Sequence, residues 1–143
     1  MNKTKSVVVD SDSIFAIYNP NDPLNPQAIK TLKWLIKEEY QLIYPTSVIF
    51  EVVSLFQRVL PIQTVTEKLI NMTRNNELLI YIVDQELLKE TALIFKPKGS
   101  RKNTLIDCSV AAVAKKIKAK GIFSFDEFYT KQGLVLVKDL VGK

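Results

Sequence analysis

The sequence Val7-Val8-Val9-Asp10-Ser11-Asp12-Ser13 combines an apolar run with a cluster of acids and serines. Three consecutive β-branched apolar residues are typical of a short strand buried on both faces, as in a parallel sheet. The acids and serines that follow favour helix caps and turns. Because ligands of open α/β sheets bind at the carboxyl ends of the strands, Asp10 is either a helix cap or the start of a site.

The rest of the chain alternates short apolar strands with helical segments, without repeats or low-complexity tracts. We expect strands over residues 7–9, 41–44, 78–83, 122–125 and 134–137. Helices are expected over residues 13–18, 26–39, 46–60, 64–74, 84–95 and 104–120, the last of them ended by Gly121. This alternation predicts a mainly parallel five-stranded sheet with helices on both faces. Residues 1–143 are therefore expected to form a single α/β domain of three layers, α/β/α.

The composition excludes several kinds of active site. The chain has no histidine and one cysteine, Cys108, which rules out His-dependent triads, imidazole acid–base chemistry and a zinc site built from these residues. Catalysis must then use carboxylates, hydroxyls, lysines or a metal held by oxygen. The polar N-terminus, the lone cysteine and the lack of a run of roughly 20 apolar residues predict a cytoplasmic protein without membrane contact. The net charge of +5 suggests a polyanionic partner.

Four acids occupy unusual positions in this pattern: Asp10, Glu51, Asp107 and Asp126. Asp10 and Asp126 each end an apolar strand, and the other two lie near the starts of helices. If the sheet is parallel, all four can stand near its carboxyl edge. Carboxylates at close range raise one another's pKa, and a divalent cation such as Mg²⁺ or Mn²⁺ relieves that repulsion and makes the cluster a site.

Each acid also has a purely structural interpretation. Asp10 or Asp12 can cap the helix that begins near Ser13, and Asp126 can cap the turn that follows it. Thr104 and Asp107 fit a capping box. Glu51 fits no capping box, and a carboxylate among apolar residues needs a partner, for which Arg58 is one candidate.

The motifs in their order resemble the PIN-domain family, and within it the compact VapC-type toxin ribonucleases. The resemblance covers nearly the whole chain and rests on five segments: the opening strand through Asp12, the turn at 19–23 with its helix, Pro45 to Glu51, the alanine-rich helix 105–114, and Ser124-Phe125-Asp126 with Tyr129. Ser124 stands where many members have Thr, and Tyr129 replaces the commoner Phe.

This resemblance implies a Mg²⁺- or Mn²⁺-dependent endoribonuclease on a five-stranded parallel sheet, with Asp10, Glu51, Asp107 and Asp126 as catalytic metal ligands. Ser11 and Ser124 would orient the ligands or the phosphate, and Asp12 would be a ligand, a support for the ligands or a cap. RNA contacts would come from a basic loop with Lys96, Lys98, Arg101 and Lys102, for which a solvated charged loop is the structural alternative. The resemblance further implies a homodimer and an antitoxin protein that blocks the acidic groove.

Two other functions remain open at this point. Asp10-Ser11-Asp12 is similar to the Asp-x-Asp signature of haloacid-dehalogenase-like phosphatases, in which Asp10 would be the nucleophile and Asp12 the acid–base. That interpretation leaves Glu51 and Asp107 without a role. A non-catalytic RNA-binding PIN domain is the other alternative.

Overall fold

A parallel sheet forms the centre of the domain in the computed structural model, which describes residues 4–58 and 62–142. Its four strands are β1 (Ser6–Val9), β2 (Gln41–Pro45), β3 (Leu79–Tyr81) and β4 (Gly121–Phe123), in the order β3-β2-β1-β4. The valines of the central strand β1 are at most 1% exposed, as expected of a strand covered on both faces. Val9 pairs with Phe123, so the residues after them, Asp10 and Ser124, leave the sheet side by side.

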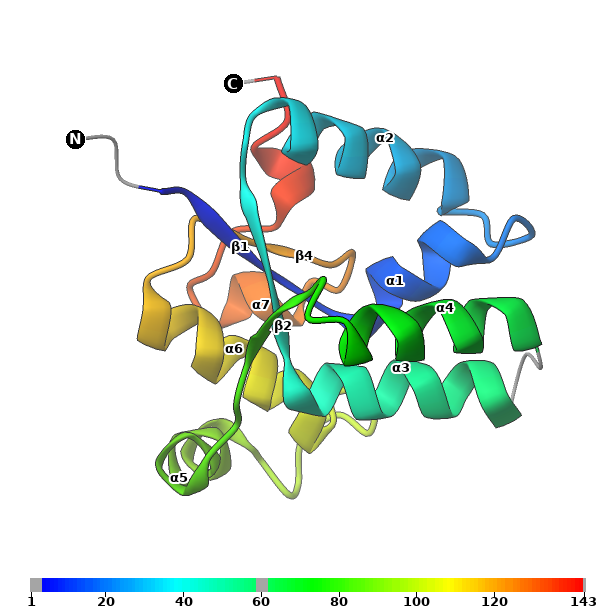
Figure 1. The fold of residues 1–143 in the computed structure, drawn as a ribbon. Helices are drawn as coiled ribbons and strands as arrows, with labels where there is room; N and C mark the ends of the chain where they lie inside the picture. The colour runs from blue at the N-terminus through cyan, green and yellow to red at the C-terminus, as the bar shows by residue number, and fades with distance from the viewer. Residues whose placement is uncertain (1–3, 59–61, 143) are drawn as a thin grey trace.

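Helices cover both faces of the sheet and complete the predicted three layers (Figure 1). On one side lie α1 (Ser11–Tyr18), α2 (Asn25–Lys37) and α4 (Gln63–Arg74), and on the other α5 (Gln85–Ile94) and α6 (Leu105–Ile117). α3 (Thr46–Arg58) begins directly after β2 and contacts α1, α4 and α6. Two short helices, α7 (Phe128–Lys131) and the 3-10 helix η1 (Val137–Asp139), follow β4.

The small side chains in the middle and C-terminal half of α6 bring this helix close to the sheet. Ala111, Ala112 and Ala114 are buried together with Val110 and Val113, and α6 contacts both β1 and β2. Because a helix that connects parallel strands runs antiparallel to them, the first turn of α6 lies at the carboxyl ends of the strands. This turn carries Asp107.

The predicted fifth strand over residues 134–137 is wrong. Only Leu136 forms an isolated parallel bridge, to Ile122, and the chain then turns into η1. The local bonds from Asp139 N to Leu136 O (3.0 Å) and from Leu140 N to Val137 O (2.8 Å) close this turn. Leu136 and Val137 are fully buried, so their apolar pattern reflects packing rather than strand pairing.

Gly121 does not end a helix, contrary to the sequence-based expectation. α6 stops at Ile117, and its C-cap is Lys118 in the left-handed conformation, with φ 54°. Gly121 is instead the first residue of β4. A Cβ at this position would lie 2.9 Å from the Val135 carbonyl oxygen, so the glycine permits close packing of β4 against the segment that follows it.

The other elements agree with the expected ones to within a few residues at each end. The last residues of the helix expected over 46–60 lie outside the described residues, in which α3 runs to Arg58. In the described part of the chain, no helix has the length and apolar character needed to cross a membrane.

Candidate active site

The structure brings the four sequence-predicted acids to the carboxyl edge of the sheet. Asp10 follows β1, Asp126 lies just beyond β4, and α3 and α6 carry Glu51 and Asp107. Their proximity is visible in the electrostatics of Asp107. Burial raises the pKa of Asp107 to about 6, and repulsion from Asp126, Glu51 and Asp12 adds to this shift.

Asp10 is the most enclosed of these acids, at 2% exposure. Its Oδ1 accepts a hydrogen bond from the backbone N–H of Ser11 (2.7 Å), which caps α1, and its Oδ2 accepts one from the Tyr129 hydroxyl (2.5 Å). Burial raises the pKa of Asp10 well above its ordinary value, as does the nearby Asp12. Burial and Asp10 also raise the pKa of Tyr129, so this phenol keeps its proton and donates a hydrogen bond to Asp10.

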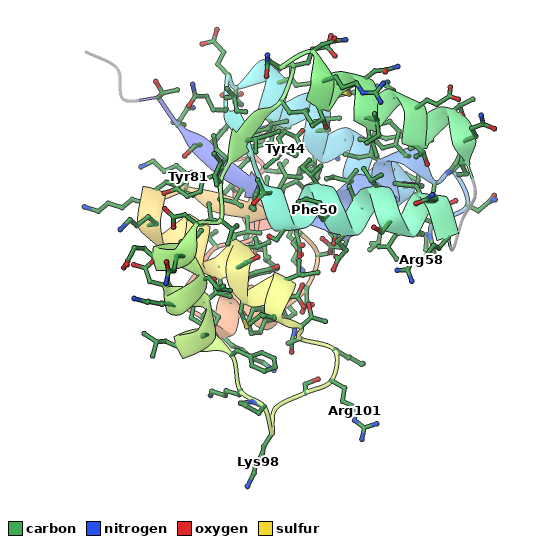
Figure 2. The ribbon with its side chains drawn as sticks, turned by 60° about the horizontal axis from the view of Figure 1, so that its bottom comes forward. Tyr44, Phe50, Arg58, Tyr81, Lys98 and Arg101 are labelled. Carbon is green, nitrogen blue, oxygen red and sulfur yellow. The ribbon has the colours of Figure 1, made fainter. Side chains whose placement is uncertain are left out.

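Glu51 finds its partner in Ser11 rather than in Arg58. The Ser11 hydroxyl donates a hydrogen bond to Glu51 Oε1 and so joins the start of α1 to α3. Within residues 4–58 and 62–142, no ion pair links Glu51 to Arg58. Figure 2 shows Arg58 at the far end of α3, where it lines a groove together with Glu51 and Ile106. Glu51 therefore has no ion pair among the described residues.

Asp107 and Asp126 perform the structural roles predicted for them and still join the cluster. Asp107 Oδ2 accepts from Thr104 N (3.0 Å), and Thr104 Oγ1 accepts from Asp107 N (3.3 Å), which completes the capping box. Asp126 Oδ1 accepts from Phe128 N (2.9 Å), and its Oδ2 accepts from Asn103 Nδ2 (3.4 Å). Capping fixes the orientation of each carboxylate and leaves the residue half-buried at the edge of the sheet.

Two serines fix the spacing between α3 and α6. The hydroxyls of Ser47 and Ser109 lie 2.6 Å apart, and Ser109 Oγ donates to the Ile106 carbonyl (2.6 Å). Ser109 uses its proton for that carbonyl, so Ser47 is the donor between the two helices. This bond ties the helix of Glu51 to the helix of Asp107.

Asp12 does not cap α1, because Asp10 is the N-cap. Its Oδ2 accepts hydrogen bonds from Ser124 Oγ and from Phe125 N, both at 2.9 Å, and Ser124 Oγ in turn accepts from Asp126 N (3.1 Å). Asp12 and Ser124 thus hold the segment that carries Asp126 against the start of α1. Asp12 Oδ1 is buried without a hydrogen-bond partner, and burial raises the pKa of this carboxyl.

The chemistry of this cluster fits a divalent cation of the magnesium type. Every donor is a carboxylate or hydroxyl oxygen, the class that Mg²⁺ and Mn²⁺ prefer. Asp12 Oδ1 is a buried oxygen in need of a positive partner. In the described part of the chain, no lysine or arginine forms an ion pair with Asp12 or with any of the four predicted ligands. As the side chains lie in residues 4–58 and 62–142, no group of three acidic or cysteine residues is placed to hold a metal ion. The acids therefore form an open cluster without a ready coordination shell.

The basic loop lies between α5 and α6, beside the helix of Asp107. Lys96, Lys98, Arg101 and Lys102 are all exposed, and Figure 2 shows Lys98 and Arg101 pointing away from the body of the domain. The four cations are therefore available to a polyanion. Their role in RNA binding stays a prediction.

Sequence reasoning missed the contacts of Tyr129 and Asn103 with the acids. Tyr129 is fully buried, and a buried tyrosine needs a partner for its hydroxyl. Its place three residues after Asp126 was therefore a usable signal. For Asn103, which donates to Asp126 from the basic loop, the sequence carries no such signal because the contact depends on the path of the loop.

Comparisons with known proteins agree with this geometry. A crystal structure of Mycobacterium tuberculosis VapC20, described as a toxin that cleaves the sarcin-ricin loop, matches with a TM-score of 0.74 at 17% identity and covers 90% of this chain and 96% of that one. A likeness at this identity shows the fold alone. No curated protein matches the sequence. The family model named PIN domain matches residues 7–131, a span that includes all four predicted acids, and the chain belongs to the PIN-domain family.

Proposed function

We propose that this protein is an endoribonuclease that hydrolyses RNA phosphodiester bonds with the help of Mg²⁺ or Mn²⁺. The observation that carries the proposal is the convergence of Asp10, Glu51, Asp107 and Asp126 without a neutralising lysine or arginine among the described residues. An uncompensated acid cluster repels an RNA phosphate, so its use on RNA requires a cation.

The four acids would hold that cation, with Asp12 Oδ1 as a further oxygen beside them. A divalent ion bound here supplies positive charge that neutralises the carboxylates and stabilises the charge developing on the phosphate during hydrolysis. The chain's own contribution is to orient the acids and to hold the segments that carry them together at one edge of the sheet. The less these groups must rearrange during the reaction, the less free energy is lost.

Three hydrogen-bonded supports perform this positioning. Tyr129 orients Asp10, Ser11 bridges Asp10 to Glu51, and the pair of Asp12 and Ser124 fixes the segment of Asp126. Such supporting bonds tune the basicity and orientation of metal-binding groups, and their loss typically costs about 10- to 100-fold in metal affinity or activity.

We also propose that the enzyme is the cytoplasmic toxin of a toxin–antitoxin pair, that it forms a homodimer, and that the antitoxin blocks the acidic groove. The fold that it shares with VapC20 supports this part, because that protein is described as an RNA-cleaving toxin. Sedimentation of the purified protein as a monomer would contradict the homodimer. A gene without a neighbouring antitoxin gene would contradict the toxin–antitoxin pair.

Membership of the PIN-domain family argues against the haloacid-dehalogenase-like alternative. In that alternative Asp12 would be the acid–base, but its Oδ2 is engaged by Ser124 and Phe125. A non-catalytic RNA-binding domain is the remaining rival.

The test is cleavage of a panel of structured RNAs with Mg²⁺ or Mn²⁺, with wild type compared with Asp10→Asn. This substitution keeps the size of the side chain and removes one ligand charge. We expect cuts that require the metal and disappear in the variant. Equal cutting by both proteins would point to a contaminating nuclease, and RNA binding without cutting would favour the non-catalytic rival.

A further inference from the structure

A cavity of about 250 Å³ lies beside the acid cluster, on the side of the basic loop. The loop between α5 and α6 forms one wall, and α7 with the residue after it forms the other. The lining residues that bear on its chemistry are Lys96, Ser100, Asn103, Phe128, Lys131 and Gln132. Of these six, Asn103 is the residue whose side chain bonds to an acid of the cluster.

Two lining residues connect the cavity directly to the acids. Asn103 Nδ2 and Phe128 N both donate to the carboxylate of Asp126, at 3.4 and 2.9 Å. The ring of Phe128 also packs edge-on against Tyr129, with centroids 5.2 Å apart, and Tyr129 donates to Asp10. A molecule in the cavity is therefore one residue away from Asp126 and two residues away from Asp10.

The lining has the chemistry of a nucleobase site rather than that of a gap in the core. Phe128 offers an aromatic ring, on which bases of single-stranded nucleic acid commonly stack. The side-chain amides of Asn103 and Gln132 and the hydroxyl of Ser100 can donate to and accept from the edge of a base. Lys96 and Lys131 at the same cavity carry the charge that the flanking phosphates need.

The geometry points to a nucleobase-binding subsite for RNA, formed by Phe128, Gln132 and the loop 96–103, that receives a base flanking the phosphate held at the acid cluster. This inference rests on the proposed ribonuclease function. It assigns base selection to this cavity. Lys98 and Arg101, which point away from the body (Figure 2), contribute attraction that does not depend on sequence.

The experiment measures binding of four single-stranded RNA hexamers, A6, C6, G6 and U6, to the full chain in the presence of Ca²⁺, a cation that takes oxygen ligands and neutralises the acid cluster. Fluorescence anisotropy at several salt concentrations gives an affinity and a salt slope for each hexamer. We expect wild type to prefer one hexamer over the weakest by about tenfold. Phe128→Leu should weaken binding of the preferred hexamer by about tenfold, within the range measured for base–aromatic stacking, and leave the salt slope unchanged.

Gln132→Ala is the second variant, which keeps the test valid if Phe128→Leu fails to fold. It should reduce the preference among the hexamers while binding of the weakest hexamer changes little. Phe50→Leu is the matched control, since Phe50 is an aromatic residue on α3, 76% exposed and outside the cavity. This control should behave as wild type.

The proposal is overturned if no hexamer is preferred, or if both cavity variants keep the preference of wild type. It is also overturned if Phe50→Leu changes the preference as much as they do. Because the measurement reports binding and is made without Mg²⁺ or Mn²⁺, it does not depend on the proposed cleavage activity. RNA cutting that requires Asp10, together with unselective binding, would contradict the subsite and support the ribonuclease function. Selective binding without any cutting would support the subsite and contradict the ribonuclease function.

Discussion

The acid cluster has a buried half and an open half, and the two are built differently. Asp10 and Asp12, on the β1–α1 side, are bound by hydroxyl and backbone donors, including the Tyr129 hydroxyl and the Ser124 hydroxyl. Asp107 and Asp126 are half-buried. Asp107 is oriented by its helix-cap bonds, and Asp126 by a turn bond from Phe128 N and by Asn103. A carboxylate can therefore be part of a helix cap and a site residue together, as Asp107 is. The buried half should support both folding and activity, and the open half chiefly activity.

The largest effect should come from Asp107→Asn in the open half. Loss of one ligand charge should lower RNA cleavage by about 100-fold or more, a loss typical of removing a group that stabilises charge in a transition state. The amide oxygen can still accept from Thr104 N, so the cap is kept. In the metal-free protein at neutral pH the free energy of unfolding should not fall, because the raised pKa of Asp107 means that its charge is unfavourable in the folded state. Cleavage kinetics and chemical denaturation of the same preparation measure the two quantities.

Asp84→Asn is the matched control for this substitution. Asp84 caps α5 through a bond to Leu87 N (2.9 Å) but lies outside the cluster. The two variants therefore make the same change at two helix starts. Equal activity losses in both would show that Asp107 acts only as a cap and has no part in the chemistry of the cluster.

Tyr129→Phe probes the buried half and should affect both properties. It removes the hydroxyl that donates to Asp10 at 2.5 Å. We expect cleavage to fall about 10- to 100-fold and the free energy of unfolding to fall by about 1–3 kcal/mol, because a buried acceptor loses its donor. Tyr81→Phe, at a half-buried tyrosine on β3, is the control and should change neither. A Tyr129 variant with normal activity would show that the support of Asp10 is dispensable.

The sequence predicted the position of a site residue correctly where that position depends only on the end of a strand. The buried valines predicted β1, and a parallel sheet then required Asp10 and the residues after β4 to meet at one edge. It was uninformative where a contact depends on the path of a loop, as for Asn103 with Asp126. The apolar residues 134–137 were misinterpreted because burial and strand pairing impose the same pattern.

The structural and functional interpretations of the acids were never exclusive. A cap bond occupies part of a carboxylate and fixes its direction, which is what a ligand also requires. Asp107 belongs to a capping box and is repelled by Asp126, Glu51 and Asp12 at the same time. Asp12 is the residue for which sequence alone left three roles open, and its contacts exclude the cap.

A smaller effect is expected in the pH dependence of stability, and it comes from Asp107 in the open half. The pKa of Asp107 in the folded protein is about 6, above its ordinary value of 3.8. The folded state therefore holds this proton more tightly than the unfolded state. The contribution to stability is full below pH 3.8 and is lost as the pH rises through about 6.

We therefore expect the melting temperature of the metal-free protein to fall between pH 5 and pH 8 more steeply in wild type than in Asp107→Asn. Circular dichroism melts at several pH values measure this difference. Addition of Mg²⁺ at pH 8 should raise the melting temperature of wild type, because binding to the folded state stabilises it. Parallel pH profiles of the two proteins would contradict the raised pKa of Asp107.

The smallest effect is expected outside both halves, at the tip of the basic loop. Lys98→Gln should weaken RNA binding several-fold at low salt and reduce the slope of log affinity against log salt by about 1. Cleavage sites should not change, because a phosphate contact carries no sequence information. Altered cleavage sites, or an unchanged slope, would show that Lys98 does not act as a phosphate contact.

The most direct test of the central claim, that the converging acids form a metal site, is a calorimetric titration of Mn²⁺ into three proteins at neutral pH. Wild type and Asp139→Asn, a change at an exposed acid remote from the cluster, should show the same saturable binding. Asp10→Asn should bind Mn²⁺ at least about tenfold more weakly. Equal titration curves for all three proteins, or no saturable binding by wild type, would contradict a metal site at the acid cluster.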